Sequence, residues 1–378
     1  MDLTLSREQE MARGLFRQFA ENEVKPLAQQ IDEEERFPRE TVEKMARLGF
    51  LGIPIPREYG GQGCDQLTYL LCVEELAKVC ATTAVLLSAH VSLACDTLLK
   101  HGTEAQKQRF LVPLAKGDKL GAFALTEPDA GTDASAQKTR AVLDGDSYVL
   151  DGSKIFITNG KEADIYIVFA MTDRSKGTKG ITAFIVEKGT PGFTFGSKEK
   201  KMGIRGSSTY EICFSGCRIP KENLLGQEGK GFSIAMQALD GGRMGIAAQA
   251  TGIAAGALER TIAYVKQRVQ FGKPLAKFQN TQFQIAEMAA RVQAAELLVF
   301  KAAQAKETKK RYSVEASMAK MFASATAVDV TARCVQLHGG YGYMREYEVE
   351  RMMRDAKVTE IYEGTSEVQK MVVAGALL

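Results

Sequence analysis

Ile165-Tyr166-Ile167-Val168-Phe169 is the stretch that decides the fold class, because Ile165, Ile167 and Phe169 recur with the period of two that is typical of a β-strand. A second alternation follows at Tyr210, Ile212 and Phe214, and the pairs Asp144-Gly145 and Pro191-Gly192 predict turns. Between about residues 120 and 224, no helical pattern of about 12 residues separates the expected strands. We therefore expect an antiparallel sheet that is closed or sandwiched.

Helical signals precede this segment. Ser6-Arg7-Glu8-Gln9 and Thr103-Glu104-Ala105-Gln106 both have the spacing of a capping box, and apolar residues follow each box at helical intervals. Residues 81–99 are apolar on nearly every face, with Asp96 as their one formal charge. Such a pattern predicts a helix that is buried inside the molecule.

Helical periodicity returns from about residue 225 and continues in long runs, including residues 280–307 and 313–337. Alanine-rich faces in these runs allow close helix approach, which fits either an intramolecular bundle or an oligomer interface. The sequence thus predicts an α+β protein with an N-terminal helical domain (residues 1–119), a central antiparallel β domain (residues 120–224) and a C-terminal long-helix bundle (residues 225–378).

Composition bounds the class of protein. The chain has 378 residues and 45% hydrophobic residues, enough for two or three domains with real cores. Lys and Arg number 49 against 46 Asp and Glu, so the formal charge is only +3. That charge is too small to predict nucleic-acid binding, and an anionic ligand must be met by local clusters.

Three further features bear on location. The seven cysteines contain no C-x-x-C pair, which suits a reducing cytoplasm. Met1-Asp2-Leu3-Thr4-Leu5 has no basic region followed by an apolar core, so no targeting peptide is expected. We expect no segment to be apolar over the roughly 20 residues that a membrane span requires, and therefore a soluble, cytoplasmic protein without a membrane partner.

Residue patterns alone leave the chemistry open. Neither a G-x-x-x-x-G-K-[ST] motif nor a G-x-G-x-x-G between strand and helix occurs, and the three histidines have no metal or triad spacing. Residues 125–133 combine hydroxyls and small residues, which suits either a cofactor cradle or an ordinary loop. Glu363 follows apolar neighbours and precedes a glycine, so it is either a desolvated carboxylate or one of many surface acids.

Five motifs in order carry a family resemblance: Phe123-Ala124-Leu125-Thr126-Glu127-Pro128, Ile157-Thr158-Asn159-Gly160, Arg268-Val269-Gln270-Phe271-Gly272, Gln336-Leu337-His338-Gly339-Gly340 and Ile361-Tyr362-Glu363-Gly364-Thr365. Together they resemble the signatures of acyl-CoA dehydrogenases, most closely the bacterial short-chain, butyryl-CoA type. The helical, β, helical order is also that family's three-domain architecture.

The resemblance implies an FAD-dependent elimination that forms a trans-2-enoyl-CoA. In it, the Glu363 carboxylate removes the α proton, the β hydrogen leaves as hydride to the flavin, and electrons then pass to an electron-transferring flavoprotein. It also implies a homo-oligomer, tetrameric in most of the family and at least dimeric, because residues from a neighbouring subunit reach the cofactor.

The resemblance assigns residues to each role. Glu363 is the catalytic base. The implied substrate contacts are Thr132, Asp240, Arg243, Tyr362 and Gly364. The implied FAD contacts are Phe123, Leu125, Thr126, Gly131, Thr132, Phe156, Ile157, Thr158, Asn159, Arg268, Phe271, Gln279, Gln336, Leu337, Gly339, Gly340, Thr365 and Glu367.

Departures from other family branches narrow the expected substrate. Relatives of the isovaleryl type take their base from the helix that holds residues 239–243, but Gly242 occupies that place here. Glutaryl-type relatives hold an Arg in the helix that matches residues 81–99, and none occurs there, which predicts an unsubstituted acyl chain. We expect Leu87, His90 and Val91 to limit the depth of the acyl pocket. For Arg243, the alternative is a surface charge at a helix start.

Two other functions fit the same resemblance. An acyl-CoA oxidase shares the fold and the base but passes electrons to oxygen, and the lack of an added C-terminal domain disfavours it. A flavoprotein of this fold with a nucleic-acid-binding role is disfavoured by the charge of +3 and the lack of an added basic domain.

Overall fold

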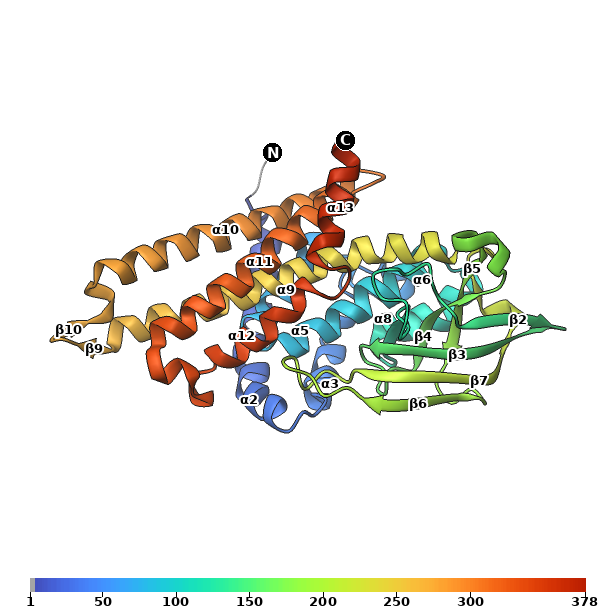
Figure 1. The fold of residues 1–378 in the computed structure, drawn as a ribbon, viewed down its shortest axis with the longest axis horizontal. Coiled ribbons are helices and arrows are strands. Elements are labelled where there is room, and N and C mark those ends of the chain that lie inside the picture. The colour runs from blue at the N-terminus through green and yellow to red at the C-terminus, as the bar shows by residue number, and fades with distance from the viewer. Residues whose placement is uncertain (1–3) are drawn as a thin grey trace.

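The computed structural model describes residues 4–378, and helices enclose one end of a mixed β-sheet (Figure 1). Residues 1–3, which belong to the segment where no targeting peptide is expected, lie outside the described part. The predicted order of helical, β and helical segments is confirmed. The exact boundaries at residues 119 and 224 stay a prediction.

The N-terminal segment is helical throughout. Its α-helices are α1 (Arg7–Phe19), α2 (Lys25–Glu33), α3 (Arg39–Arg47), α4 (Gln66–Ala77), α5 (Ala81–Ser88), α6 (Asp96–His101), α7 (Glu104–Gln106) and α8 (Val112–Lys116). Helices α1 and α7 begin at the two predicted capping boxes, in which Ser6 and Thr103 each bond reciprocally with a glutamine three residues later.

The π-helical segment η4 (Ala89–Cys95) joins α5 to α6, so that residues 81–101 run as one helix. By length and composition this helix is apolar enough to cross a membrane, which corrects the expectation that no segment is. However, 94% of its apolar window is buried inside the protein. It is therefore the core helix that its all-round hydrophobicity predicts.

The sheet contains eight strands in the order β6-β7-β3-β2-β4-β5-β8, with β1 paired to β4. Nearly all pairs are antiparallel, as predicted, but β1 runs parallel to β4, and β2 meets β4 in a parallel bridge. A parallel pair needs a crossover connection, which the β2–β3 hairpin supplies. The strands are β1 (Gly121–Ala124), β2 (Arg140–Asp144), β3 (Ser147–Ile157), β4 (Ile165–Met171), β5 (Ile181–Glu187), β6 (Phe193–Lys198), β7 (Tyr210–Pro220) and β8 (Leu224–Leu225).

Strand β4 is buried on both faces, and its alternation divides two cores. Ile165, Ile167 and Phe169 pack with residues of α6, α8 and α9 (Gly231–Gln267). Tyr166 and Val168 point the other way and pack with β3, β5 and β7. The period-two pattern therefore places the sheet directly against the helices.

The C-terminal bundle is built around α9, which the β9–β10 hairpin (Val269–Gln270 and Lys273–Pro274) connects to α10. Glycines allow α4 to cross α9 closely, because a Cβ at Gly252 or Gly256 would overlap the carbonyl oxygen of Glu74 or Lys78. The remaining helices are α10 (Gln279–Thr308), α11 (Ser313–His338), α12 (Val349–Lys357) and α13 (Ser366–Leu377).

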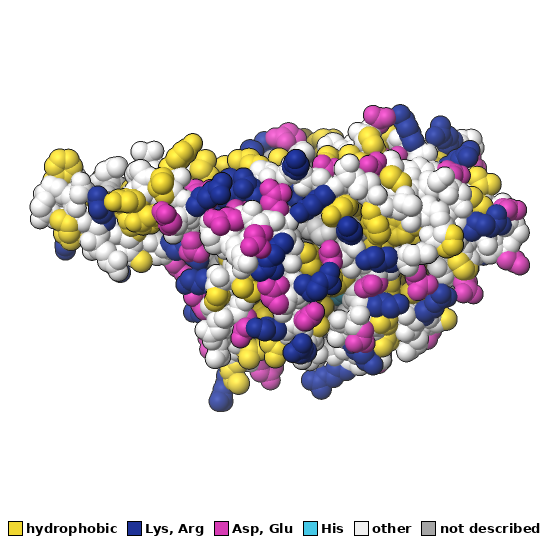
Figure 2. Space-filling model, turned by 90° about the horizontal axis from the view of Figure 1, so that it is seen from below, with side chains coloured by type: hydrophobic (Ala, Val, Ile, Leu, Met, Phe, Trp, Pro, Cys, Tyr) yellow, Lys and Arg dark blue, Asp and Glu magenta, His cyan; other side chains and the backbone are white. Residues whose placement is uncertain are grey.

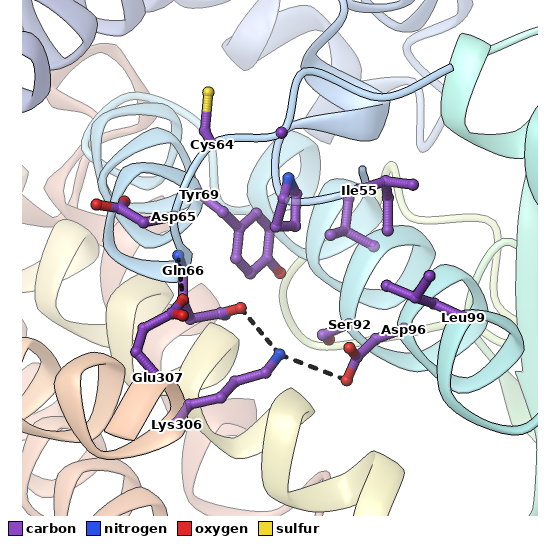
Figure 3. Close-up of a pocket in the computed structure, with 13 residues that line it drawn as sticks. Ile55, Cys64, Asp65, Gln66, Tyr69, Ser92, Asp96, Leu99, Lys306 and Glu307 are labelled. Atoms are coloured by element: carbon purple, nitrogen blue, oxygen red, sulfur yellow. Dashed lines mark hydrogen bonds and ion pairs between the residues drawn. The ribbon is translucent and has the colours of Figure 1, made fainter. Parts of the chain in front are cut away.

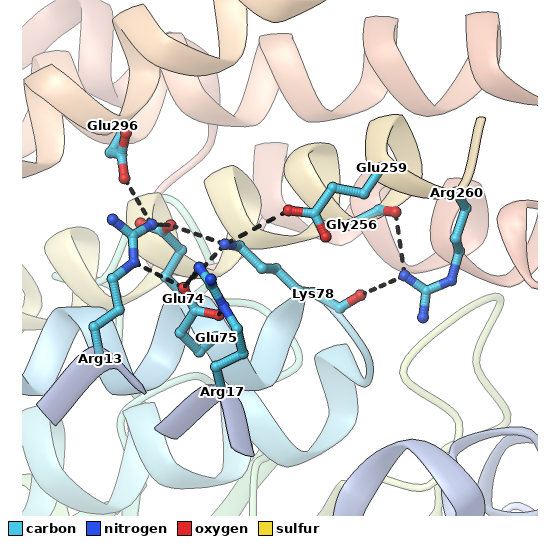
Figure 4. Close-up of polar contacts among 9 residues, drawn as sticks. All are labelled: Arg13, Arg17, Glu74, Glu75, Lys78, Gly256, Glu259, Arg260 and Glu296. Atoms are coloured by element: carbon cyan, nitrogen blue, oxygen red, sulfur yellow. Dashed lines mark hydrogen bonds and ion pairs between the residues drawn. The ribbon is translucent and has the colours of Figure 1, made fainter. Parts of the chain in front are cut away.

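Buried ion pairs fasten α1 to this bundle (Figure 4). The guanidinium of Arg13 donates to Glu74 and Glu75 of α4, at 2.6 and 2.8 Å, and to Glu296 of α10 at 2.7 Å. Lys78 also donates to Glu75, at 2.9 Å. Because Glu74 and Glu75 are almost fully buried, each carboxylate depends on these cations for its charge to be tolerated.

Candidate active site

Glu363 lies in the turn between η11 (Val358–Glu360) and α13, in an unusual backbone conformation. Its φ is +53°, a value that non-glycine residues rarely adopt, and the following Gly364 has φ +95°. The carboxylate oxygen Oε2 is buried and has no hydrogen-bond partner among residues 4–378. Burial raises the pKa of Glu363 to about 7, although Lys320 and Arg243 act in the opposite direction.

The carboxylate of Glu363 meets a side-chain-free position of α9. A Cβ built on Gly242 would overlap Glu363 Oε2 and would lie 2.9 Å from Leu93 Cδ2 of η4. A side chain at position 242 and the carboxylate of Glu363 therefore compete for the same space. One acid, not two, is accommodated at this point between α9 and η4.

Arg243 is only 5% exposed, although its guanidinium carries a permanent positive charge. Its Nη1 donates to Asp240 Oδ1 at 2.7 Å, and Ser313 Oγ of α11 donates to the other oxygen of Asp240. Because α9 begins at Gly231, the alternative that Arg243 is a surface charge at a helix start is wrong. Arg243 Nε is buried and has no hydrogen-bond partner in the described part of the chain, so the pair retains an unused donor near Glu363.

Gln249 and Lys320, which the sequence did not single out, complete this region. Tyr362 donates its hydroxyl to Gln249 of α9, and Gln249 Nε2 donates to the carbonyl of Ala81 at 3.0 Å. Lys320 of α11 is fully buried and donates to the carbonyl of Gly364 at 2.6 Å. A lone lysine in the small-residue face of α11, between Ala316 and Ala323, is the signal that would have found it.

The expectation that His90 limits the acyl pocket stays a prediction. Its imidazole is engaged on both sides by backbone, since Gly121 N donates to Nδ1 at 3.0 Å and Nε2 lies 3.2 Å from Leu114 O. Burial lowers the pKa of His90 to about 4, so the ring is neutral. His90 joins η4 to α8 and β1, whereas Leu93 and Ser88 are the residues that meet the glycines of α9. Leu87 and Val91 pack in the main hydrophobic core.

The predicted cofactor residues of the β domain lie side by side. The buried Lys154 of β3 donates to the carbonyl of Leu125 at 3.0 Å and to Glu127 at 2.7 Å, and Ile155 N donates to the carbonyl of Thr126 at 2.9 Å. Asn159 donates to the carbonyls of Leu86 and Gly121. Together these contacts bring Phe123, Leu125, Thr126, Gly131, Thr132, Phe156, Ile157, Thr158 and Asn159 into one region.

This region suits a planar aromatic group with a polar edge. Phe156 has φ +58°, and its ring is 59% exposed, so a strained backbone presents an aromatic face to the outside. Thr126 and Thr158 are half-buried, and a Cβ on Gly131 would meet nothing within 4 Å. An aromatic ring of this kind can stack on the face of an isoalloxazine, and the two threonine hydroxyls can donate to its polar edge.

Most of the other predicted cofactor residues lie at or near the β9–β10 hairpin, at the end of the molecule opposite the sheet (Figure 1). The Arg268 guanidinium lies 5.1 Å from the ring centre of Tyr341, and Phe271 is 93% exposed. Gln279, Gln336, Gly339 and Gly340 are exposed there, and Leu337 is half-buried. At ~1.5 Å per residue along α9, Arg268 is roughly 40 Å from Gly242. One chain does not bring the two groups together.

Two cavities lie elsewhere in the described structure. Thr365 and Glu367, which follow Glu363, line one of about 320 Å³ with Met321 and Lys357. The other, of about 440 Å³, lies where the loop at residues 54–66 meets η4 and the end of α10 (Figure 3). There Lys306 donates to Gln66 at 2.9 Å and to Asp96 at 3.4 Å. Of the residues that the sequence assigns to the site, only Val91, which is expected to limit the acyl pocket, lines this second cavity.

Comparison with known families matches the whole chain in three parts. Residues 6–118, 122–217 and 229–378 match the models described as the N-terminal, middle and C-terminal domains of acyl-CoA dehydrogenase.

Individual relatives are similar over their full length. The chain is 59% identical over 377 residues to "Acyl-CoA dehydrogenase, short-chain specific" of Clostridium acetobutylicum, covering 100% of both chains. The structure of butyryl-CoA dehydrogenase from Megasphaera elsdenii has a TM-score of 0.98 at 55% identity, with 100% of both chains covered. A chain in the structure of the electron transferring flavoprotein of Acidaminococcus fermentans gives 0.99 at 55%, with the same coverage.

The raised pKa of Glu363 predicts a pH-dependent difference in stability. The folded-state pKa of about 7 exceeds the unfolded value near 4.3, so the charged form is penalised in the fold and stability is lost as the pH rises towards 7. Relative to Glu363→Gln, the parent protein should melt at a lower temperature at pH 8, and the gap should shrink towards pH 4.5. Glu367→Gln, at an exposed position of the next helix, should show no such shrinking gap. A difference in melting temperature between the parent and Glu363→Gln that does not change with pH would contradict the raised pKa of Glu363.

Proposed function

This chain belongs to the acyl-CoA dehydrogenase family, and we propose that it oxidises short-chain acyl-CoA such as butyryl-CoA to the trans-2-enoyl-CoA, with Glu363 as the catalytic base. The observation that carries this proposal is the buried, unbonded carboxylate oxygen of Glu363, held against Gly242 with its pKa raised to about 7. A base with a pKa near the working pH combines the deprotonated state with a strong proton affinity.

In this mechanism the Glu363 carboxylate takes the proton from the α carbon of the thioester. The hydride that leaves the β carbon would need an acceptor, which is the chemistry that FAD would supply when bound. A thioester α proton is too weakly acidic for a carboxylate in water, and burial supplies the missing basicity. The Glu363 backbone N–H is proposed to donate to the thioester carbonyl, so that base and oxyanion donor belong to one residue.

The residues around Glu363 are proposed to hold the substrate. Arg243 is kept in place by Asp240, and its buried Nε is left to donate to the CoA portion. Thr132 extends these contacts from the β domain. Tyr362 and Gly364 line the acyl side of Glu363, where the bond from Tyr362 to Gln249 closes the space between the turn and α9.

We propose that FAD is shared between two subunits. Residues 123–132 and 156–159, with Thr365 and Glu367, would hold one part of it, and Arg268, Phe271, Gln279, Gln336, Leu337, Gly339 and Gly340 of a neighbour would hold the rest. The support is that the second group lies at the end of the molecule opposite the β-sheet, with Arg268 roughly 40 Å along α9 from Gly242. A dimer is the minimum that satisfies both groups, and a tetramer is the state we propose.

An electron-transferring flavoprotein is the proposed electron acceptor, supported by the similarity to a chain in the structure of such a protein. We also propose a cytoplasmic location, supported by seven free cysteines. The nucleic-acid role is disfavoured, because basic and acidic side chains are interspersed over the face seen in Figure 2, without a basic stripe.

The proposed function predicts that anaerobic addition of butyryl-CoA bleaches the yellow protein, and that Glu363→Gln binds FAD and butyryl-CoA but loses this reaction. Loss of a general base typically costs ~10²- to 10⁴-fold in rate. Stopped-flow absorbance measures the reduction. Flavin reduction by Glu363→Gln at the parent rate would remove Glu363 from the mechanism, and rapid oxygen uptake during aerobic turnover would favour the oxidase instead.

The neighbouring glycines Gly241 and Gly242 offer a matched pair of alanine variants. In Gly242→Ala the new methyl group occupies the place of Glu363 Oε2, so the carboxylate must turn away and the rate of flavin reduction should fall by roughly 10²-fold or more. In Gly241→Ala the added Cβ meets nothing nearer than Asp96 Oδ2 at 3.4 Å, so the rate should stay within a few-fold of the parent. Equal rates for the two variants would show that position 242 does not control the base.

The shared cofactor predicts that Arg268→Ala loses FAD and its oligomeric state together, because a ligand bound between subunits couples the two equilibria. Lys266→Ala, an exposed cation near the end of the same helix, serves as the control and should keep both. Flavin content and analytical ultracentrifugation on dilution measure the two properties. An Arg268→Ala protein with full FAD occupancy and unchanged assembly would contradict the shared site.

A further inference from the structure

The turn that holds Glu363 needs support from outside itself. Glu363 and Gly364 both have positive φ values, and for Glu363 this conformation costs energy that surrounding contacts must offset. Two side chains donate to the carbonyl oxygens of this turn. Gln369 Nε2 of α13 lies 3.2 Å from Glu363 O and 2.9 Å from Gly364 O, and Lys320 Nζ of α11 lies 2.6 Å from Gly364 O.

Burying the charged side chain of Lys320 costs more free energy than a single hydrogen bond requires. Its side chain has no exposed surface, and it forms no ion pair in the described part of the chain. Burial lowers its pKa to about 8, with Glu363 as the largest opposing influence. A neutral donor such as glutamine would hold the same carbonyl at lower cost. The retained ammonium therefore points to a use for its charge.

Few charged groups surround the carboxylate of Glu363. Arg243 approaches from α9 and Lys320 from α11, and these two cations favour the ionised carboxylate against its burial. From α4 and the turn itself, Tyr69 and Tyr362 face it as neutral phenols, because burial raises both of their pKa values. Around Lys320, the other influences are Arg243, Glu360 and Glu367. Arg243 is already paired with Asp240, whereas Lys320 forms no ion pair with any of residues 4–378.

We propose that Lys320 is a positioning residue for the catalytic base: its buried ammonium holds the carbonyl of Gly364, so that the turn aims the carboxylate of Glu363 at Gly242, and its charge keeps that carboxylate ionised. This role rests on the proposed function, in which Glu363 takes the α proton. Lys320 does not touch the substrate carbon, and it acts only through the turn and through its charge.

Gln369 makes the inference testable, because it donates to the same carbonyl without a charge. Lys320→Met and Gln369→Met each delete one donor and keep an apolar side chain of similar length. Only Lys320→Met also deletes a cation. Lys320→Gln, which keeps a polar group at the buried position, carries the same test if the Met variant does not fold.

The experiment measures the titration of Glu363 in the holoenzyme by infrared difference spectroscopy against Glu363→Gln in each background, and the rate of flavin reduction by butyryl-CoA from pH 6 to 9. In Lys320→Met and Lys320→Gln, the titration of Glu363 and the acid limb of the rate should move upward by roughly one pH unit or more, since an adjacent opposite charge is lost. The rate at pH 7 should fall roughly 10- to 100-fold, with FAD content retained.

Gln369→Met should lower the rate but leave the titration of Glu363 and the acid limb within a few tenths of a pH unit of the parent. The proposal is overturned if the Lys320 variants titrate like the parent, or if their shift is no larger than that of Gln369→Met. The infrared titration needs no turnover. A parent enzyme that butyryl-CoA does not reduce would therefore refute the proposed function without deciding the role of Lys320.

Discussion

A carboxylate that is buried yet left without a hydrogen bond is the constraint on which the rest of this structure depends. Leaving the Oε2 atom of Glu363 unsatisfied is costly, and the surrounding helices tolerate it only because the oxygen faces the side-chain-free surface of α9 at Gly242. A carboxylate that accepted hydrogen bonds would cost less free energy to bury, but it would be a weaker base. The cost in stability and the basicity have the same origin, which is the desolvation of this one group.

Helix α9 connects the parts that this carboxylate needs. Near its N-terminal end it packs on the sheet and presents Asp240, Gly242 and Arg243 to the turn at Glu363. Its far end continues into the exposed hairpin, next to the loop that follows α11. Because a helix is rigid and rises only ~1.5 Å per residue, residues that the family resemblance assigns to one cofactor are kept far apart within a chain. The length of α9 is therefore the structural basis of the proposed assembly of subunits.

Two buried lysines support the two halves of the site in the same way. Lys154 holds the carbonyl of Leu125 beside the exposed ring of Phe156, and Lys320 holds the carbonyl of Gly364 beside Glu363. Burial lowers the pKa of each lysine to about 8. Lys154 is balanced by an ion pair with Glu127, whereas Lys320 is not paired. This contrast separates a lysine that fixes a loop from one whose charge acts on the base.

The sequence by itself determined the class of fold, the order of its segments and the family. The period of two in β4, the two capping boxes and the long helical runs are local patterns, and local patterns are set by neighbours in the chain. The motif that contains Glu363 likewise identifies the expected base without coordinates. The parallel pairing of β1 with β4 was missed, because register between distant strands leaves no local signal.

Only the tertiary structure decided which side chains meet. His90 and Lys320 both occur in apolar helical stretches, and nothing local tells that the first binds the backbone of α8 and β1 while the second binds the turn of Glu363. Gly242 and Glu363 are far apart in the chain, and their shared space exists only once α9 and the turn are packed together. The pKa of Glu363 is raised for the same reason, because desolvation is a property of everything that surrounds a group and not of its own segment.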